Sequence, residues 1–399
     1  MSLSEPQFTE EKQRFLNRFL EPRHDTYNVD KTKNWPDSRS IRSYHGGDKP
    51  GKDHGGVGAF NPDKYEYPQL WPAIIDTTWE STKHKIVGGT DLLTIGKPGS
   101  GKSTLANHIA LRSIEGITPT SAWSTKKNSV AKVVWRGSSA RSEWLPLAPW
   151  TTLCLPEGVD YDAKFVPRVP TEEGYTLTLD ELEQHVVRDI VRYRNPKHLN
   201  KELLDVGQFH VVYPDPRMRG IQGIYENSDE KQYDAPPEGD LFDERDPSNH
   251  WWFGWVLARV EHGPHDWTTL ILDEIGDIAP QGAGKDEFGT LQKIKLLKDS
   301  WVDARKMGLS IFAFGHSEED IHSKIRRKMR WRMYLHGTAN PTSKGEVVGF
   351  NHVPMDHGHL ASKYEYAGLV FNEQNFDWIS WPEYYTPIDH KLKLERRGK

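Results

Sequence analysis

The segment Gly96-Lys97-Pro98-Gly99-Ser100-Gly101-Lys102-Ser103 constrains the fold of this 399-residue chain more than any other segment. It matches the pattern G-x-x-x-x-G-K-[ST], in which a glycine-rich turn joins a buried strand to a helix. The surroundings fit, because the apolar run 91–95 precedes the turn and a helix-forming run begins at Ser103. We therefore expect an α/β fold that holds a phosphate group where this strand ends.

The residue types in this segment suit the binding of ATP and Mg²⁺. Glycines let backbone N–H groups wrap a phosphate, Lys102 would neutralise the β- and γ-phosphates, and the Ser103 hydroxyl would bind Mg²⁺. A chance glycine-rich turn is the alternative, and the strand and helix on either side disfavour it. The predicted nucleotide-binding residues are Gly96, Lys97, Pro98, Gly99, Ser100, Gly101, Lys102, Ser103 and Thr104.

A second motif, Thr269-Leu-Ile-Leu-Asp273-Glu274, consists of a buried-type strand that ends in two acids. A P-loop nucleoside triphosphatase needs a carboxylate on the Mg²⁺ side of its site and a base for the attacking water. We predict that Asp273 binds Mg²⁺ together with Ser103, and that Glu274 is the catalytic general base. The alternative is a strand that ends in two solvated acids.

The remaining chain alternates predicted strands and helices, which indicates a mostly parallel central sheet flanked by helices. Predicted strands cover 91–95, 131–135, 150–155, 208–213, 268–274, 311–316 and 331–337. Predicted helices cover 6–20, 103–114, 179–193, 251–260 and 286–307, and a basic helix follows His316. The proline- and acid-rich stretch 214–249 is predicted to be loop.

The two halves of the predicted site are far apart in the chain, which favours one core with a large insertion. We expect an ATPase core over 71–399, with an internal insertion at about 115–265. Residues 1–70 are expected to form an N-terminal helix and an extended arm, because 23–68 is polar and rich in Gly, Pro and His. Such an arm could embrace a neighbouring subunit.

Composition excludes several classes of protein. The formal net charge is −5, from 52 basic and 57 acidic residues, so a nucleic-acid surface would have to be a local patch. The single cysteine, Cys154, excludes an internal disulfide and fits a reducing compartment. No apolar run is long enough for a membrane span, and the N-terminus has no signal-peptide core. These features predict a cytoplasmic protein.

The order of motifs resembles that of the additional-strand, catalytic-glutamate P-loop ATPases, and within them the FtsK/HerA group of DNA pumps and packaging ATPases. The block TLILDEIGDIAP…SWVDARKMGLSIFAFGHSEEDIHSKIRRKMRWRMYLHG carries the likeness, which covers residues 86–115 and 266–340. Two other segments, VVWRGSSARSEWLPLAPWTTLCLPEGVD and FHVVYPDP, resemble ATPases of archaeal viruses and mobile elements. The resemblance implies a RecA-like core that binds ATP and Mg²⁺. It also implies a ring of identical subunits, usually a hexamer, that acts on double-stranded DNA in the host cytoplasm or in association with the virion.

The resemblance also suggests roles for residues outside the two motifs. In this group the strand after the catalytic glutamate ends in a residue, usually Gln, that senses the γ-phosphate. The matching position here is His316, and an imidazole can also bond a phosphate. One subunit's arginine completes its neighbour's site, and the preferred candidates are Arg326 and Arg330, with Arg305, Arg327 and Arg332 as others. Each of these is alternatively an ordinary surface residue.

Several weaker features have two interpretations each. The basic run 322–332 is either a DNA contact or a solvated helix face, and the loop WRGSSARSEW could line a channel. The aromatic cluster 251–255 either stacks bases or packs in the core. His352, Asp356, His357 and His359 could hold Zn²⁺, although no cysteine lies nearby. Cys154 is predicted to be a buried small hydrophobe.

We therefore predict an ATP-hydrolysing motor ATPase that translocates or packages double-stranded DNA as a ring. Two alternatives stay open at this point. One is an ATPase that drives virion assembly, protein assembly or secretion. The other is a nucleotide-binding scaffold that does not hydrolyse ATP.

Overall fold

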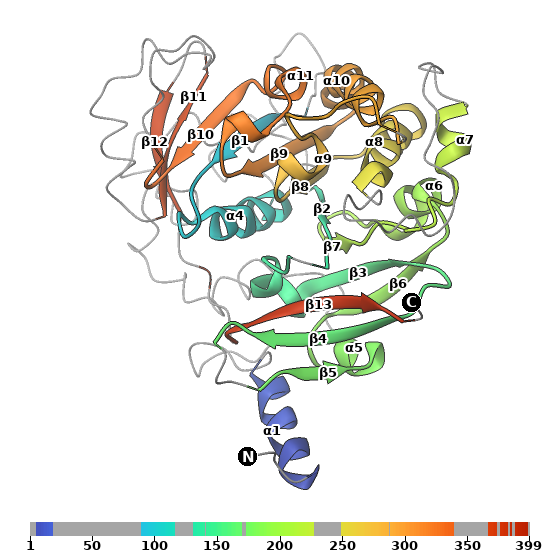
Figure 1. The fold of residues 1–399 in the computed structure, drawn as a ribbon, viewed down its shortest axis with the longest axis vertical. Helices are drawn as coiled ribbons and strands as arrows, with labels where there is room; N and C mark the ends of the chain where they lie inside the picture. The colour runs from blue at the N-terminus through green and yellow to red at the C-terminus, as the bar shows by residue number, and fades with distance from the viewer. Residues whose placement is uncertain are drawn as a thin grey trace.

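The computed structural model describes residues 5–18, 89–115, 131–139, 141–169, 173–226, 249–286, 288–338, 366–372, 376–381, 384 and 388–397. A sheet of ten strands runs through these residues (Figure 1). In spatial order its strands are β12 (Phe376–Ser380), β11 (Ala367–Phe371), β10 (Trp331–Leu335), β1 (Asp91–Ile95), β9 (Leu309–Gly315), β8 (Thr268–Leu272), β2 (Lys132–Arg136), β7 (Phe209–Val212), β3 (Thr151–Pro156) and β6 (Asp189–Tyr193).

Neighbouring strands run parallel from β10 to β6, and only β11 and β12 add antiparallel pairs at one edge. This confirms the predicted, mostly parallel sheet. Because parallel strands end at the same edge of a sheet, the residues after β1, β8 and β9 lie close together. Ile95, the last residue of β1, pairs with Gly315 of β9.

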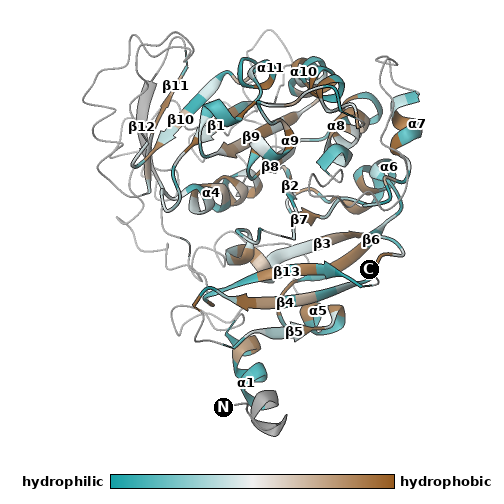
Figure 2. Ribbon diagram, viewed as in Figure 1, coloured by the Kyte–Doolittle hydropathy of each residue, from teal (hydrophilic) through white to brown (hydrophobic). Residues whose placement is uncertain are grey.

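Helices cover both faces of this sheet. Helix α4 (Lys102–Glu115) lies on one face, whereas α8 (His250–His262) and α10 (Thr290–Lys306) lie on the other (Figure 1). Figure 2 shows β7 and β9 as largely hydrophobic, whereas α10 carries many hydrophilic residues. The buried side chains of the sheet and of these helices form two separate cores, one on each face of the sheet.

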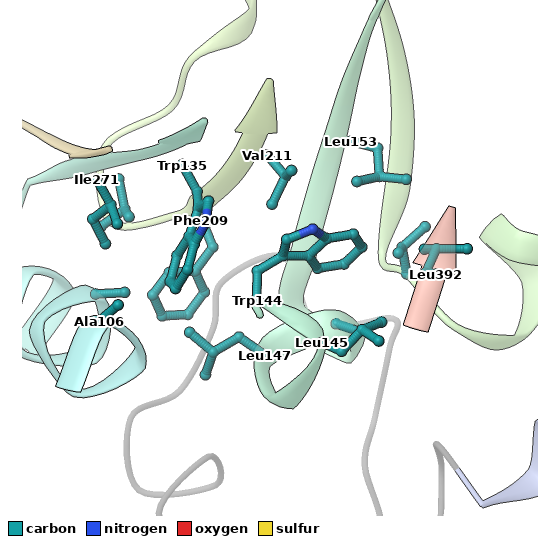
Figure 3. Close-up of a cluster of buried hydrophobic side chains, with 14 of the residues drawn as sticks. Ala106, Trp135, Trp144, Leu145, Leu147, Leu153, Phe209, Val211, Ile271 and Leu392 are labelled. Atoms are coloured by element: carbon teal, nitrogen blue, oxygen red, sulfur yellow. The ribbon is translucent and has the colours of Figure 1, made fainter. Parts of the chain in front are cut away.

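Strand β2 illustrates how alternate side chains feed the two cores. Val133 and Trp135 point into the core that contains α4, and Val134 points into the core that contains α8. In the first core, Trp135 packs near Phe209 and Ala106, and Trp144 lies among Leu145, Leu147 and Leu153 (Figure 3). Because both faces are buried, β2 is apolar on both sides, as expected of a central parallel strand.

A second, antiparallel sheet lies beside the first core. It consists of β13 (His390–Arg396), β4 (Tyr161–Pro167) and β5 (Tyr175–Leu177), and α5 (Leu179–His185) and α1 (Glu5–Asn17) pack against it (Figure 1). Phe15 of α1 stacks on Tyr175 with ring centroids 4.6 Å apart and meets Phe165 edge-on at 5.1 Å. Lys12 also pairs with Glu181 at 2.7 Å. The N-terminal helix is therefore docked on its own chain.

Short helices connect the longer elements. They are η1 (Leu145–Trp150), α6 (Pro196–His198), η2 (Leu199–Leu203), α7 (Ile221–Glu226), α9 (Ile275–Ile278), η4 (Glu318–Asp320) and α11 (Ser323–Arg326). Each of these seven lies on a connection between two successive strands of the large sheet.

The structure corrects three expectations from the sequence. The predicted helix 179–193 is helix α5 followed by strand β6, because 189–193 pairs with β3 at the sheet edge. The predicted loop 214–249 contains α7. In the basic run 322–332, only α11 is helical before β10 begins.

Other expectations are confirmed. The side chains of Trp251, Trp252 and Trp255 in α8 are at most 1% exposed, so this cluster is core packing. Cys154 in β3 is fully buried, and burial raises the pKa of its thiol. Among the described residues, no helix combines the length and the apolar character needed to cross a bilayer. His352, Asp356, His357 and His359 lie outside the described residues, as does most of the predicted arm.

Candidate nucleotide site

The glycine-rich turn joins β1 to α4 as predicted from its sequence. Gly99 and Gly101 have φ angles of 80° and 88°, which glycine adopts without a steric penalty. The Thr104 hydroxyl donates to the carbonyl oxygen of Gly101 at 2.7 Å and accepts from the indole N–H of Trp381 at 3.1 Å. The turn is thereby braced from within and from the segment after β12.

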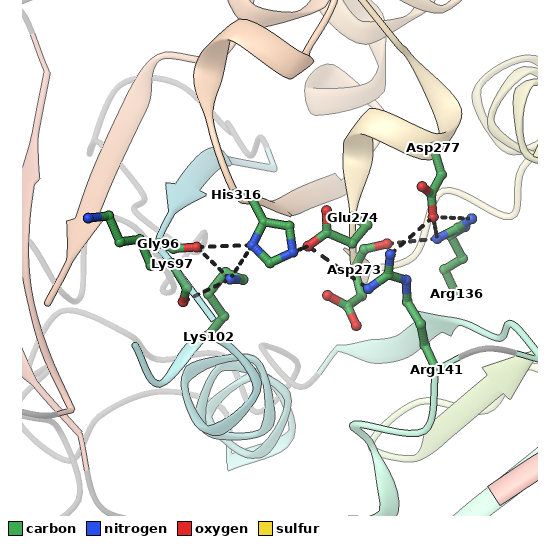
Figure 4. Close-up of polar contacts among 9 residues, drawn as sticks. All are labelled: Gly96, Lys97, Lys102, Arg136, Arg141, Asp273, Glu274, Asp277 and His316. Atoms are coloured by element: carbon green, nitrogen blue, oxygen red, sulfur yellow. Dashed lines mark hydrogen bonds and ion pairs between the residues drawn. The ribbon is translucent and has the colours of Figure 1, made fainter. Parts of the chain in front are cut away.

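Lys102 is the first residue of α4, and its ammonium group lies over this turn. Nζ donates to the carbonyl oxygens of Gly96 at 2.5 Å and Lys97 at 3.2 Å, and lies 3.1 Å from Nδ1 of His316 (Figure 4). Burial lowers the pKa of Lys102, and Glu274 and Asp273 oppose that change. An anion that enters the turn would favour the charged form of this half-buried lysine.

His316 follows β9 and connects Lys102 to Glu274. Its Nε2 lies 3.2 Å from Oε1 of Glu274, while its Nδ1 faces Lys102 (Figure 4). The structure therefore places the predicted sensor residue between the phosphate-loop lysine and the predicted base. The imidazole of His316 thus contacts both the lysine of the phosphate loop and the predicted base.

Glu274 follows β8 in a left-handed backbone conformation, with φ 54° and ψ 72°. A glutamate adopts this conformation at a cost, which the surrounding structure must offset. Burial raises the pKa of its carboxyl group, and the electrostatic effect of the neighbouring Arg141 and His316 opposes this. A carboxylate with a raised pKa accepts a proton more readily than an exposed one.

Asp273 is 8% exposed, and its Oδ2 atom has no hydrogen-bond partner among the residues that the structure describes. A buried carboxylate oxygen without a partner is costly unless a cation or a donor meets it. Carboxylate and hydroxyl oxygens are also the ligands that Mg²⁺ prefers. Asp273 and the Ser103 hydroxyl at the start of α4 therefore fit a Mg²⁺ ion.

Three residues of this site were not assigned to it from the sequence: Arg136 in β2, Arg141 in the loop after β2, and Asp277 in α9. Arg136 is 4% exposed and donates to the carbonyl oxygen of Asp273 at 2.7 Å, and also to Asp277 at 3.3 Å. Arg141 lies 4.0 Å from Glu274 Oε1 and 3.6 Å from Asp277 Oδ2 (Figure 4). Arg136 is thus tightly held, whereas the side chain of Arg141 lies beside the predicted base and has no short contact with any residue that the structure describes.

Glu143 is a further carboxylate in the site. The amide of Asn107 in α4 donates both to the carbonyl oxygen of Ser103 and to that of Glu143, each at 2.8 Å, and so ties this loop to the phosphate-binding helix. Burial, followed by the nearby Asp273, raises the pKa of Glu143 to about 7. The sequence offered one signal for Arg141 and Glu143, because the segment WRGSSARSEW begins at the end of a predicted strand. In the folded chain that strand is β2, and it pairs with β8, which precedes the two acids.

The two preferred arginine-finger candidates are held by acidic partners, Glu318 and Asp91, that are not members of the Lys102, Asp273, Glu274 and His316 cluster. Arg326 is 8% exposed and donates to the carbonyl oxygen of Glu318 at 3.0 Å. Arg330 pairs with Asp91 at 3.2 Å, at the amino end of β1, which is opposite to the phosphate loop. The structure thus brings together Lys102, Asp273, Glu274 and His316, but not Arg326 and Arg330.

A parallel sheet, a glycine-rich turn between β1 and α4, and two acids after β8 define the fold of a P-loop nucleoside triphosphatase.

The solved structures to which this chain is similar include a genome packaging NTPase and a secretion ATPase. The genome packaging NTPase B204 from Sulfolobus turreted icosahedral virus 2 is 11% identical, with 74% of this chain and 98% of that chain covered, and a TM-score of 0.37. VirB4 of Thermoanaerobacter pseudethanolicus is 10% identical, with 77% and 92% covered and a TM-score of 0.42. The cytoplasmic domain of the type VII secretion ATPase EccC of Thermomonospora curvata is 14% identical, with 74% and 25% covered and a TM-score of 0.31.

Sequence identity and TM-score are low in each of these comparisons. No protein-family model and no curated protein matches the chain. The class of the protein therefore rests on its own motifs and strand order.

Proposed function

We propose that this protein binds ATP with Mg²⁺ and hydrolyses it, and that it uses the hydrolysis as a ring-shaped motor to translocate or package double-stranded DNA. The observation that carries the ATPase proposal is the placement of Glu274. Its carboxylate lies after β8, linked through His316 to Lys102 of the phosphate loop. A nucleophilic water beside the γ-phosphate would be within reach of this base.

In the proposed reaction, the backbone N–H groups of the turn and Lys102 hold the phosphates. Mg²⁺, when bound at Ser103 and Asp273, supplies charge neutralisation on the β- and γ-phosphate oxygens. Glu274 takes a proton from water as its oxygen attacks the γ-phosphorus, and the bond to the β-phosphate oxygen breaks to give ADP and phosphate. His316 and Arg141 would stabilise negative charge on the transferred group.

The test of hydrolysis uses two substitutions with different expected results. Lys102→Ala should abolish both ATP binding and turnover, because the phosphates lose the lysine cation that would neutralise them. Glu274→Gln should lower turnover by about 10²–10⁴-fold and keep ATP bound, because only the base is lost. Phosphate release and equilibrium binding of a fluorescent ATP analogue measure the two quantities.

Glu319→Gln is the matched control, because Glu319 is an exposed acid near the same sheet edge and should keep full turnover. Full turnover in Glu274→Gln would show that Glu274 is not the general base. A wild-type chain that binds ATP without releasing phosphate would identify a nucleotide-binding scaffold instead.

The motor and its polymer are proposed from the resemblance of the motif order to DNA pumps. Stimulation of ATP turnover by double-stranded DNA is the expected result for such a motor. Turnover that stays constant over a range of DNA concentrations would favour an ATPase of protein assembly or secretion. Electron microscopy of the ATP-bound protein with DNA would show whether the subunits form a ring around it.

A further inference from the structure

A pair of arginines on the loop after β7 is built into the fold but takes no part in the nucleotide site. Arg217 and Arg219 follow Asp215, whose side chain is 0% exposed. Nε of Arg219 donates to Asp215 Oδ2 at 2.5 Å, and Nε of Arg217 lies 3.6 Å from Oδ1. One buried carboxylate thus orients two guanidinium groups.

The carbonyl oxygen of Glu157, just after β3, holds the same two groups from the other side. It accepts from Nη2 of Arg219 at 2.5 Å and from Nη2 of Arg217. Each guanidinium has five N–H donors, and these contacts use only some of them. The two side chains remain 36% and 30% exposed, so further donors can reach a ligand in solvent.

Met218, between the two arginines, has a left-handed backbone with φ 55°, which is uncommon for a residue with a side chain. Its side chain is 2% exposed, so core packing offsets the cost of this conformation. The buried Met218 anchors the loop, and the arginines on either side of it meet the same two acceptors, Asp215 and the Glu157 carbonyl. The side chains are therefore pre-organised and lose little freedom when they bind.

The pair continues into a second basic segment. A Cβ atom at Gly220 would lie 2.7 Å from Cβ of Asn195, so the arginine loop packs directly against the segment after β6. That segment carries Arg194, whose side chain is 61% exposed, and the exposed Lys201, with Glu202 3.8 Å from Arg194. The cations lie beyond the carboxyl ends of β7 and β6, at the same sheet edge as the phosphate loop.

We propose that Arg217 and Arg219, with Arg194 and Lys201 beside them, bind the phosphodiester backbone of a nucleic acid. Guanidinium groups suit phosphate oxygens because their N–H donors form a fixed fork. Cations spread over two adjoining loops fit a repeating row of phosphates better than a single one. This inference rests on the proposed function and names where the moved polymer touches the chain.

The test measures binding of the full-length protein to a labelled DNA duplex by fluorescence anisotropy over a series of salt concentrations, without nucleotide. R217Q and R219Q should each weaken binding by roughly five- to tenfold near 0.1 M salt, because each lost phosphate contact removes about 0.9 from the slope of log K against log salt. R217K and R219K keep the charge and should keep most of the slope.

R168Q is the matched control, because Arg168 is a half-exposed arginine that pairs with Asp389 beside the small sheet. It should leave affinity and slope unchanged. Each single variant leaves one arginine on Asp215, and the midpoint of thermal unfolding verifies that the fold is intact. Wild-type affinity and slope in both R217Q and R219Q would overturn the proposal, as would a wild-type chain that binds no DNA.

Another outcome would reassign the pair. If R217Q and R219Q lost ATP turnover in the absence of DNA, and mixing with Lys102→Ala chains restored it, the arginines would act on a nucleotide held by a second copy. That result would overturn the DNA assignment. Because the anisotropy experiment contains no nucleotide, its result is independent of whether the protein hydrolyses ATP, and phosphate release from the wild type tests that separately.

Discussion

The residues around Glu274 differ in how firmly the fold holds them. Arg136 is buried and has short contacts with Asp273 and Asp277. Among the described residues, the guanidinium of Arg141 has only long contacts, 3.6 Å and 4.0 Å, to the same acidic region. A guanidinium with long contacts can shift toward a new anion at small cost, so we expect Arg141 to respond to the γ-phosphate of the proposed substrate.

Arg141→Ala should lower kcat for ATP by roughly 10²-fold, which is the usual loss when one donor to a transition-state oxyanion is removed. ADP lacks the γ-phosphate, so the affinity for ADP should stay near that of the wild type. Steady-state kinetics and ADP titration measure the two effects, and Arg168→Ala serves as the exposed control. An unchanged kcat in Arg141→Ala would leave this residue with a purely structural role.

At the scale of single residues, the sequence predicted those site residues that belong to a contiguous motif. Lys102 and Ser103 stand in the phosphate loop, and Asp273 and Glu274 end one apolar run. Arg141 and Glu143 could not be placed in the same way. Their loop reaches the site only because β2 pairs with β8, and that pairing joins segments far apart in the chain.

At the scale of elements, the segment 179–193 shows why a side-chain pattern can mislead. Thr178 and Glu181 form a capping box that starts α5, which fits the predicted helix start. Residues 189–193 contain Ile190 and Val191, which suit a strand as well as a helix. Parallel pairing with β3 satisfies the backbone of this segment, so the tertiary contact decides in favour of β6.

Strand β7 carries a buried histidine that makes stability depend on pH. His210 is 1% exposed, lies 3.1 Å from the carbonyl oxygen of Val133, and accepts from the N–H of Asp205. Burial lowers its pKa from 6.5 to about 4, so the folded state binds this proton more weakly than the unfolded state. Its stabilising contribution is therefore complete above pH 6.5 and is lost as pH falls toward 4.

We expect wild-type unfolding free energy to fall by about 2 kcal/mol more than that of His210→Gln between pH 7 and pH 5, at 1.36 kcal/mol per pKa unit. Gln can replace both hydrogen bonds but does not titrate in this range. Urea unfolding at the two pH values measures the difference, and His250 is present in both proteins and cancels. Parallel pH dependence in the two chains would exclude His210 as the source.

At the scale of the whole molecule, α1 links the N-terminus to the small sheet. Phe15 is 3% exposed and meets the rings of Tyr175, Phe165 and His390. Phe15→Ala should therefore remove roughly 3–5 kcal/mol of packing free energy. The loss should appear as faster hydrogen exchange of the α1 amides, while ATP turnover stays unchanged because the nucleotide site lies on the other sheet.

Gln13→Ala is the control for this variant, because Gln13 is exposed and bonds only to Asn17 among the described residues. Its α1 amides should exchange at the wild-type rate. Wild-type exchange in Phe15→Ala would mean that contacts other than Phe15 hold the helix to the sheet.

The central position of β1 has a consequence for the synthesis of this protein. Thr90 bonds to Ser310, and Asp91 pairs with Arg330, so the partners of this strand follow it by 220 and 239 residues. At about 5–20 residues per second, a ribosome needs roughly 10–50 s to add that much chain. The glycine-rich turn therefore leaves the ribosome long before both neighbours of β1 exist. A nascent chain that stops before residue 331 lacks β10, so one side of β1 stays unpaired until that strand has been made, even when β9 is already present.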